Sequence, residues 1–169
     1  MSRATSKALR VAVLMLAPVL FLLFTTAGSA NASWRNGALY NQESGRCLDA
    51  GPGHLQQYGC NGTAAQRFTD ISSTQYYQLQ NGLGKCIDSG QMYASGVFSC
   101  NGGDYQLWSV TYVGKDAAGR TYYQFRNVHW SDVCLDSGQN YNTDIWGNPT
   151  NGYQMGPCNS GTYQWFYWN

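Results

Sequence analysis

After residue 32 the chain alternates short runs of hydrophobic residues with polar residues and glycines. Two of the clearest runs, 77–80 and 122–126, consist of β-forming residues with polar residues between them, which is typical of half-buried strands. Glycine interrupts the pattern every few residues, as turns between short strands require. No window shows a sustained helical period with capping residues. The pattern therefore predicts an all-β fold of about a dozen short strands.

The same phrases occur three times along the chain. Each copy begins with Cys-Leu/Ile-Asp, a small residue and glycine, at 47–51, 86–90 and 134–138. A second cysteine followed by Asn comes later, a glutamine lies six positions after that cysteine, and an aromatic residue lies two positions further on. These aromatic residues are Phe68, Trp108 and Phe166. Because each copy is too small to bury a core alone, we expect three repeats, about 34–73, 74–120 and 121–169, to share one core in a closed barrel.

The first 32 residues form a separate segment. Three basic residues precede a short apolar run at 11–24, and small residues follow it and end in Ala30-Asn31-Ala32. This arrangement is typical of a secretory signal peptide that is cleaved after Ala32, or alternatively after Ala30. The apolar run is shorter than the ~20 residues that a transmembrane anchor needs. We therefore expect a secreted, extracellular domain at 33–169 with no membrane span.

Composition excludes several classes of protein. The chain is 15% aromatic and only 11% charged, unlike disordered chains. Its formal net charge is +1, and removal of the leader would take away three basic residues and no acidic one. A protein without a basic field has little to attract phosphates, so a nucleic-acid partner is not expected.

The six cysteines are expected to form disulfides. An even number of cysteines in a small exported chain is typical of a disulfide framework. No C-x-x-C pair occurs, so neither a zinc site nor a thioredoxin-type centre is expected. The repeats make pairing within each copy the simplest choice among the possible connectivities. The predicted bridges are Cys47–Cys60, Cys86–Cys100 and Cys134–Cys158.

These repeated phrases resemble the ricin B-type lectin domain, a carbohydrate-binding β-trefoil. The resemblance runs from about residue 34 to residue 168 and rests on three Cys-x-Asp phrases in register with three Gln-x-(Trp/Phe) phrases. It implies a six-stranded barrel capped by three hairpins, with up to three shallow sugar sites. In that family the Asp accepts hydrogen bonds from sugar hydroxyls, the Gln holds the Asp, and an aromatic residue two before the second cysteine stacks on the sugar.

The resemblance assigns candidate carbohydrate-binding residues copy by copy. They are Asp49, Tyr58 and Gln66 in the first copy, Asp88, Phe98 and Gln106 in the second, and Asp136 and Gln164 in the third. The third copy has Gly156 where the aromatic residue belongs, and its longer loop carries Trp146, a possible contact outside the family pattern. The Asn that often precedes the family's Gln is replaced by Ala65, Tyr105 and Tyr163.

Other interpretations of these residues stay open at this point. Each Asp precedes a small residue and glycine, where Asp often accepts hydrogen bonds from the backbone of its own turn. The two histidines, His54 and His129, belong to no catalytic motif, and no cofactor or catalytic residue is expected. A role as a targeting or adaptor subunit that binds a protein partner, or as a protease-inhibitor-like trefoil, is the alternative to sugar binding, since tyrosine-rich surfaces also suit protein interfaces.

Overall fold

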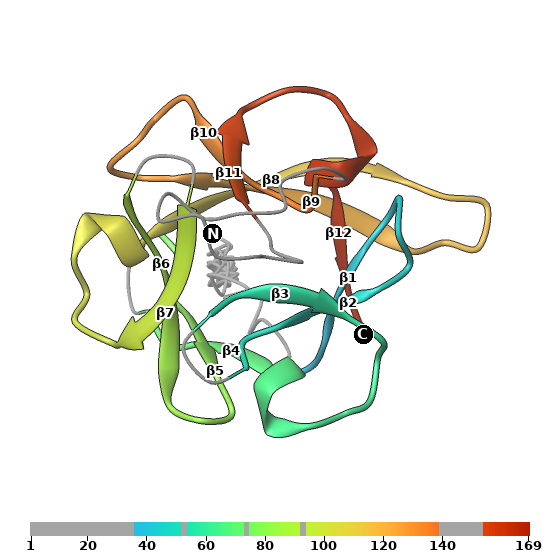
Figure 1. Ribbon diagram of the computed structural model, residues 1–169. Coiled ribbons are helices and arrows are strands. Elements are labelled where there is room, and N and C mark those ends of the chain that lie inside the picture. Colours follow the sequence, from blue (N-terminus) through green and yellow to red (C-terminus); the bar gives the residue numbers. More distant parts are fainter. Residues whose placement is uncertain (1–35, 52–53, 73–74, 92–93, 139–153) are drawn as a thin grey trace, which may run out of the picture. The chain divides into compact units, whose positions relative to one another are not determined.

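The structure is a computed structural model that describes residues 36–51, 54–72, 75–91, 94–138 and 154–169 (Figure 1). All of these residues belong to one compact unit of the chain. The expected leader and Trp146 lie outside the described residues. Within the described ranges, no helix is long and apolar enough to cross a membrane.

The described residues form short strands and three single-turn 3₁₀-helices, and no α-helix, as the alternating pattern predicts. The strands are β1 (Leu39–Asn41), β2 (Cys47–Asp49), β3 (Gln56–Tyr58), β4 (Phe68–Asp70), β5 (Leu79–Asn81), β6 (Lys85–Gln91), β7 (Ala94–Ser99), β8 (Trp108–Lys115), β9 (Thr121–Asn127), β10 (Val133–Asp136), β11 (Gln154–Pro157) and β12 (Phe166–Trp168). The 3₁₀-helices are η1 (Ala64–Gln66), η2 (Asp104–Gln106) and η3 (Thr162–Gln164).

Six strands close a barrel that no single copy could form. The last strand of each copy pairs with the first strand of the next: β4 with β5, β8 with β9, and β12 with β1. Strand β9 also pairs with β12. Two isolated bridges, Gly37–Phe68 and Tyr77–Trp108, connect the remaining neighbours in the ring. This closed β-trefoil arrangement confirms the prediction that the three copies share one barrel.

Three disulfide-linked hairpins lie around this barrel, one from each copy (Figure 1). They are formed by β2–β3, β6–β7 and β10–β11. Cys47–Cys60, Cys86–Cys100 and Cys134–Cys158 join them within the copies, so the predicted pairing is confirmed. The described residues include no free cysteine.

Equivalent residues of the three copies meet in the core. Each copy contributes an apolar residue from its first barrel strand, one from its first hairpin strand and an aromatic residue from its last barrel strand. They are Leu39, Leu48 and Phe68, then Leu79, Ile87 and Trp108, then Phe125, Leu135 and Phe166, all at most 1% exposed. Full burial of such a side chain stabilises the fold by about 1.5–3 kcal/mol. The three aromatic residues are thus core residues, as their repetition suggests.

Candidate functional site

The three repeated Asp residues lie on the first strand of each hairpin, one per hairpin. The side-chain amide of the following Gln donates a hydrogen bond to each carboxylate. The Nε2–Oδ2 distances are 3.0 Å for Gln66–Asp49, 2.9 Å for Gln106–Asp88 and 2.8 Å for Gln164–Asp136. The structure therefore brings the predicted Asp and Gln together in every copy.

Each Gln is held in turn by the backbone around the second cysteine. In the second copy, Gln106 Nε2 also donates to the Ser99 carbonyl at 3.0 Å, and its Oε1 accepts from the Asn101 amide at 2.8 Å. The equivalent bonds recur in the other two copies. The glutamines are fully buried, so they position the carboxylates rather than face a ligand.

The second oxygen of each carboxylate is also used within the fold. The backbone amides of Gly90 and Gly138 donate to Oδ1 of Asp88 and Asp136, both at 2.7 Å. In these two copies the Asp does accept a hydrogen bond from its own turn. A carboxylate oxygen has two lone pairs, so each Asp keeps acceptor capacity for a ligand.

In the first copy a side chain takes the place of the turn amide. Gln56 Nε2 donates to Asp49 Oδ1 at 3.3 Å, and Asp49 is only 5% exposed. The position paired with Asp in the second hairpin is Gly96, which brings no side chain. The sequence analysis did not predict this difference. Aligning residue 49 with 56 and residue 88 with 96 across their hairpins could have suggested it, because a Gln stands at one position and a glycine at the other.

Two exposed rings lie beside these carboxylates. Tyr58 pairs with Cys47 and Phe98 with Cys86 across their hairpins, and the two side chains are 55% and 56% exposed. The Phe98 ring extends over Gly96, since a Cβ built on that glycine would lie 2.6 Å from the ring. Because Gly96 pairs with Asp88, the second copy presents an open aromatic face next to its carboxylate.

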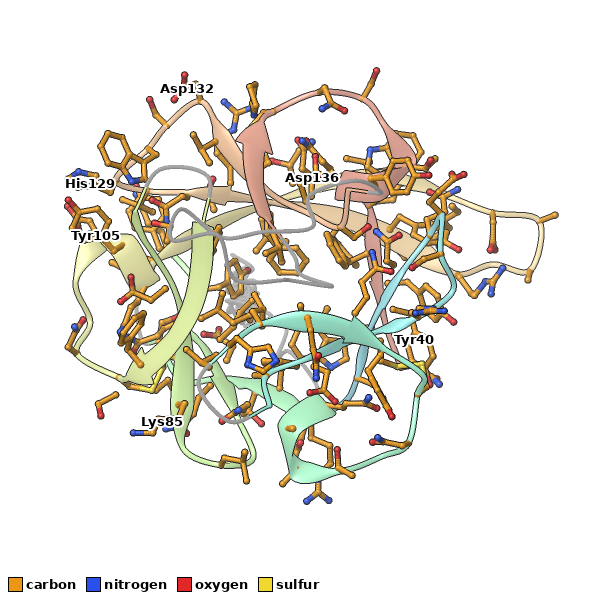
Figure 2. The ribbon with its side chains drawn as sticks, viewed as in Figure 1. Tyr40, Lys85, Tyr105, His129, Asp132 and Asp136 are labelled. Atoms are coloured by element: carbon orange, nitrogen blue, oxygen red, sulfur yellow. A yellow bond between two sulfur atoms is a disulfide. The ribbon has the colours of Figure 1, made fainter. Side chains whose placement is uncertain are left out.

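The third copy has a different surface. Gly156 pairs with Cys134, and a Cβ there would lie only 3.2 Å from Asp136 Oδ2. The pKa of the Tyr163 phenol lies above its usual value, mainly because the group is partly buried and to a lesser extent because of the negative charges of Glu43 and Asp136. Figure 2 labels Asp136 on β10.

Two sets of supporting residues were not assigned from the sequence. Gln78 and Gln124 lie behind Gln106 and Gln164 and donate to their Oε1 atoms at 2.9 and 2.8 Å. The first copy has Ala38 at this position. The two glutamines occupy matching positions in the similar stretches 77–81 and 123–127. The sequence shows this match, but only the tertiary contact shows that they support Gln106 and Gln164.

The second set connects the repeats. Asn41 Nδ2 donates to the carbonyls of Tyr163, at 2.8 Å, and of Thr162 and Trp165. Asn127 makes the equivalent bonds to the turn around Tyr105. Two of the short helices that carry the glutamines, η2 and η3, are thus held by an Asn from the next strand in the barrel, whereas Asn81 donates to the Ala50 carbonyl at 3.2 Å.

The described residues contain no group of three or more His, Cys, Asp or Glu side chains that could hold a metal ion. The acidic residues that do recur, the three Asp, are separated onto three hairpins. What each hairpin offers is a fixed hydrogen-bond acceptor and, in two copies, an exposed ring.

Comparison with known families identifies the class. The family model of the ricin-type beta-trefoil lectin domain matches residues 35–121, which is about half of the chain and includes the first two hairpins. The chain therefore belongs to the ricin-type beta-trefoil lectin family. The resemblance recognised in the repeated phrases is confirmed.

Solved structures agree on the fold. The ricin B-like lectin of Macrolepiota procera, solved in complex with lactose, superposes with a TM-score of 0.59 at 14% identity, covering 81% of this chain and 96% of the lectin. The designed three-fold symmetric protein ThreeFoil gives a TM-score of 0.59 at 21% identity, covering 78% of this chain and 96% of the design.

A larger enzyme contains the same fold as one part. The endo-β-galactosidase from Clostridium perfringens that releases GlcNAcα1-4Gal gives a TM-score of 0.56 at 15% identity; the match covers 79% of this chain but 32% of the enzyme. The present chain thus spans about a third of that protein. No curated protein sequence matches the chain.

Proposed function

We propose that this lectin-family chain is an exported protein that binds glycan or polysaccharide at the Asp-and-aromatic surfaces of its hairpins, without catalysis. The observation that carries the proposal is in the second hairpin. There the exposed Phe98 ring lies over Gly96, beside the Asp88 carboxylate that Gln106 holds in place.

These groups suit the two kinds of surface on a pyranose. An aromatic ring covers the face of C–H groups, and a carboxylate accepts hydrogen bonds from the hydroxyls at its edge. Hydrogen bonds to a charged group are roughly twice as strong as neutral ones. Asp88 is 8% exposed, so a sugar reaches only its outer edge and the site is shallow.

The three copies are proposed to differ in strength. The second copy ranks first, because it has an exposed ring and the residue paired with its Asp, Gly96, brings no side chain onto the carboxylate. In the first copy the Gln56 amide occupies one side of Asp49, and the third copy has no ring at Gly156. Several weak sites on one scaffold would gain affinity for a polymer through avidity.

Catalysis is not part of the proposal. Glycoside hydrolysis needs two carboxyl groups facing each other across one cleft. The three repeated Asp residues lie on separate hairpins, each hydrogen-bonded to its own Gln. None of them therefore faces another of the three across a cleft. The proposal of export rests on the expected leader and on the three disulfides, which persist in oxidising compartments.

A glycan array followed by titration of the best neutral sugar tests the proposal. Phe98→Ala and Asp88→Asn should each weaken binding, because they remove the platform and the charged acceptor. Tyr112→Ala and Asp132→Asn are matched controls, since Tyr112 is 59% exposed on β8 and Asp132 is an exposed acid outside the three site positions. The proposal would be overturned if the control variants lost as much sugar affinity as the site variants, or if the wild type bound no glycan. A protein partner would then be the better candidate.

A further inference from the structure

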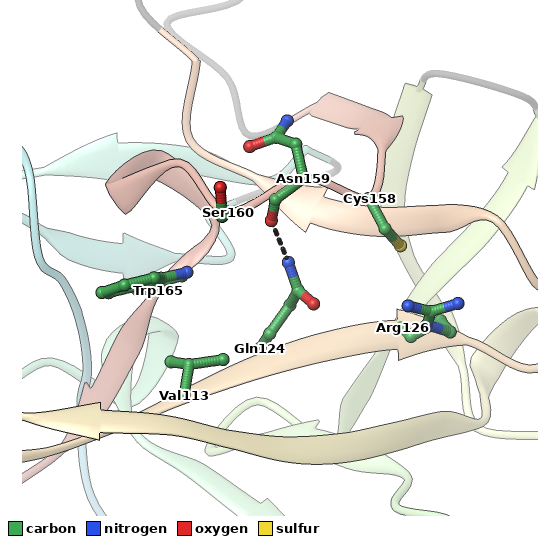
Figure 3. Close-up of a pocket in the computed structure, with 7 residues that line it drawn as sticks. All are labelled: Val113, Gln124, Arg126, Cys158, Asn159, Ser160 and Trp165. Carbon is green, nitrogen blue, oxygen red and sulfur yellow. Dashed lines mark hydrogen bonds between the residues drawn. The ribbon is translucent and has the colours of Figure 1, made fainter.

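A hollow in the third copy is lined by residues of β8 and β9 and by residues from the segment between β11 and β12. Its volume is about 320 Å³, and Figure 3 shows the side chains around it. The lining residues are Val113, Gln124, Arg126, Cys158, Asn159, Ser160 and Trp165. Ligand pockets have volumes of roughly 300–1,000 Å³, so this pocket has room for one small molecule such as a single sugar ring.

The pocket contains a buried hydrogen-bond donor that the fold leaves unused. The indole Nε1 of Trp165 is buried and has no hydrogen-bond partner among the described residues. In Figure 3 the nitrogen edge of this ring faces Gln124 and Asn159. A buried polar group without a partner is costly, so an acceptor in the pocket would stabilise this arrangement.

The other polar groups of the pocket also favour an acceptor. Arg126 is the one charged residue among the lining side chains, and no Asp or Glu lines the pocket. One guanidinium N–H, at Nη1, donates to the Ser131 carbonyl at 2.9 Å, which leaves donors for a ligand. Ser160 adds a hydroxyl. Val113, the Cys158 sulfur and the indole supply apolar surface.

The pocket is not a third-copy version of the repeated site. Trp165 is replaced by Arg67 in the first copy and by Leu107 in the second, and Tyr40 and Gln80 stand where the third copy has Arg126. Gln124 separates the pocket from the repeated site, because its amide donates to Gln164 Oε1 at 2.8 Å and to the Asn159 carbonyl at 2.7 Å. The unpaired indole and the cation therefore belong to this copy alone.

We propose that this pocket binds an acidic sugar, a uronic acid residue of a glycan, with its carboxylate at Arg126 and an oxygen at the Trp165 indole N–H. Arginine is well suited to carboxylates because its planar N–H groups donate in parallel. The indole and Val113 cover the C–H face of the sugar. The pocket itself supports an anionic ligand. The inference that this anion is part of a sugar rests on the proposed function.

Titration with galacturonate and glucuronate, followed by NMR of the indole N–H signals, tests the inference. The Trp165 signal, identified by its loss in Trp165→Phe, should shift with either uronate and not with the neutral methyl ester of galacturonate. Arg126→Gln places the second copy's residue in the pocket and should weaken uronate binding about tenfold or more, since it removes a charged hydrogen-bond donor. Arg67→Gln, which removes an equal charge in the first copy, should leave affinity unchanged.

The remaining outcomes separate this inference from the proposed function. If Asp88→Asn abolishes uronate binding and Arg126→Gln does not, the uronate occupies the repeated site and the pocket inference is wrong. If acetate shifts the Trp165 signal as strongly as uronate, the ligand is a simple carboxylate and the sugar class is wrong. Gln42 is the candidate partner within the chain, since its backbone amide donates to the Trp165 carbonyl at 2.9 Å and its buried Oε1 has no hydrogen-bond partner among the described residues. If the indole signal responds to Gln42→Ala but to no uronate, the indole is satisfied within the chain and the inference fails, whatever neutral sugars bind to the hairpins.

Discussion

At the scale of single residues, Gln106 joins the scaffold to the candidate site. Both N–H groups and the oxygen of its side-chain amide form hydrogen bonds within the protein. It donates to Asp88 and the Ser99 carbonyl and accepts from Gln78 and the Asn101 amide. Its complete burial removes competition from water. Gln106 and the Gly90 backbone amide, which donates to the other oxygen, therefore fix the position of the Asp88 carboxylate.

Replacing Gln106 by Leu should destabilise the domain by about 3 kcal/mol or more, because each buried group left unpaired costs about 1–3 kcal/mol. Denaturant unfolding measures the change. Gln80→Leu is the matched control, since that side chain is half-buried and donates a weak hydrogen bond to Cys100 Sγ at 3.4 Å; its cost should stay near or below 1 kcal/mol. A cost for Gln106→Leu as small as that of the control would contradict the role assigned to the buried network.

Phe98 and Trp108 lie only ten positions apart and are expected to respond in opposite ways. Trp108→Ala should cost about 3–5 kcal/mol, the usual loss for a large aromatic core residue, because Trp108 is 0% exposed. Phe98→Ala should change stability by less than about 1 kcal/mol and lower sugar affinity by about 1–2 kcal/mol, by analogy with other aromatic contacts. Thermal melts and sugar titrations decide the matter, and a large loss of stability for Phe98→Ala would make it a core residue.

At the scale of elements, each hairpin carries one disulfide, and the first hairpin is the shortest. Strands β2 and β3 have three residues each, and an isolated two-stranded hairpin is at best marginally stable in water. The disulfides join the start of each first hairpin strand to the segment after the second. The same segment then donates its Asn amide to the buried Gln, so the cross-link and the site share one piece of backbone.

Removing Cys86–Cys100 by replacing both cysteines with Ser should cost about 2–5 kcal/mol, as in other small disulfide-bonded domains. The comparison uses unfolding of the double variant and of the wild type under non-reducing conditions. Non-reducing peptide mapping of the wild type should find the three bridges within the copies. A bridge between copies would refute the assignment of repeats, and an unchanged unfolding free energy would show that β6–β7 needs no cross-link.

At the scale of the whole domain, the three copies have one barrel but unequal surfaces. Barrel strands pair between copies, so the repeats are coupled in stability. The hairpins also touch, since Gln57 Nε2 donates to the Ser137 carbonyl. Pseudo-symmetry therefore constrains the interior, while the exposed positions next to each Asp are free to diverge.

This divergence predicts an order of effects on sugar binding. Asp88→Asn should weaken binding most, Asp49→Asn less and Asp136→Asn least, because Gln56 donates to Asp49 in the first copy and the third copy has no ring at Gly156. Isothermal titration with one neutral monosaccharide compares the three variants directly. Equal losses from all three replacements would show that the ring and Gln56 do not determine the strength of the sites.

Much of this architecture follows from the sequence because repeated residues imply repeated environments. The cysteines, the Asp, the Gln and the core aromatic residue recur in the same order in every copy, and the second cysteine, the Gln and the aromatic residue keep a constant spacing. The sequence alone therefore assigns the cysteine pairs, the core aromatic residues and the Asp–Gln pairs. Strand limits were less certain: the expected strand at 77–80 is observed as β5 at 79–81, with Tyr77 in an isolated bridge. Short strands leave few residues to define an end.

Only the tertiary structure determines what depends on contacts between distant or dissimilar segments. Gln56 and Gly96 look unrelated in sequence, and it is their pairing with Asp49 and Asp88 that places a side-chain amide on one carboxylate and none on the other. Trp165 and Arg126 come from different elements and have no counterpart in the other copies. Repetition thus determines the fold and the equivalent residues, whereas unrepeated side chains acquire a role only when the closed barrel brings their segments together.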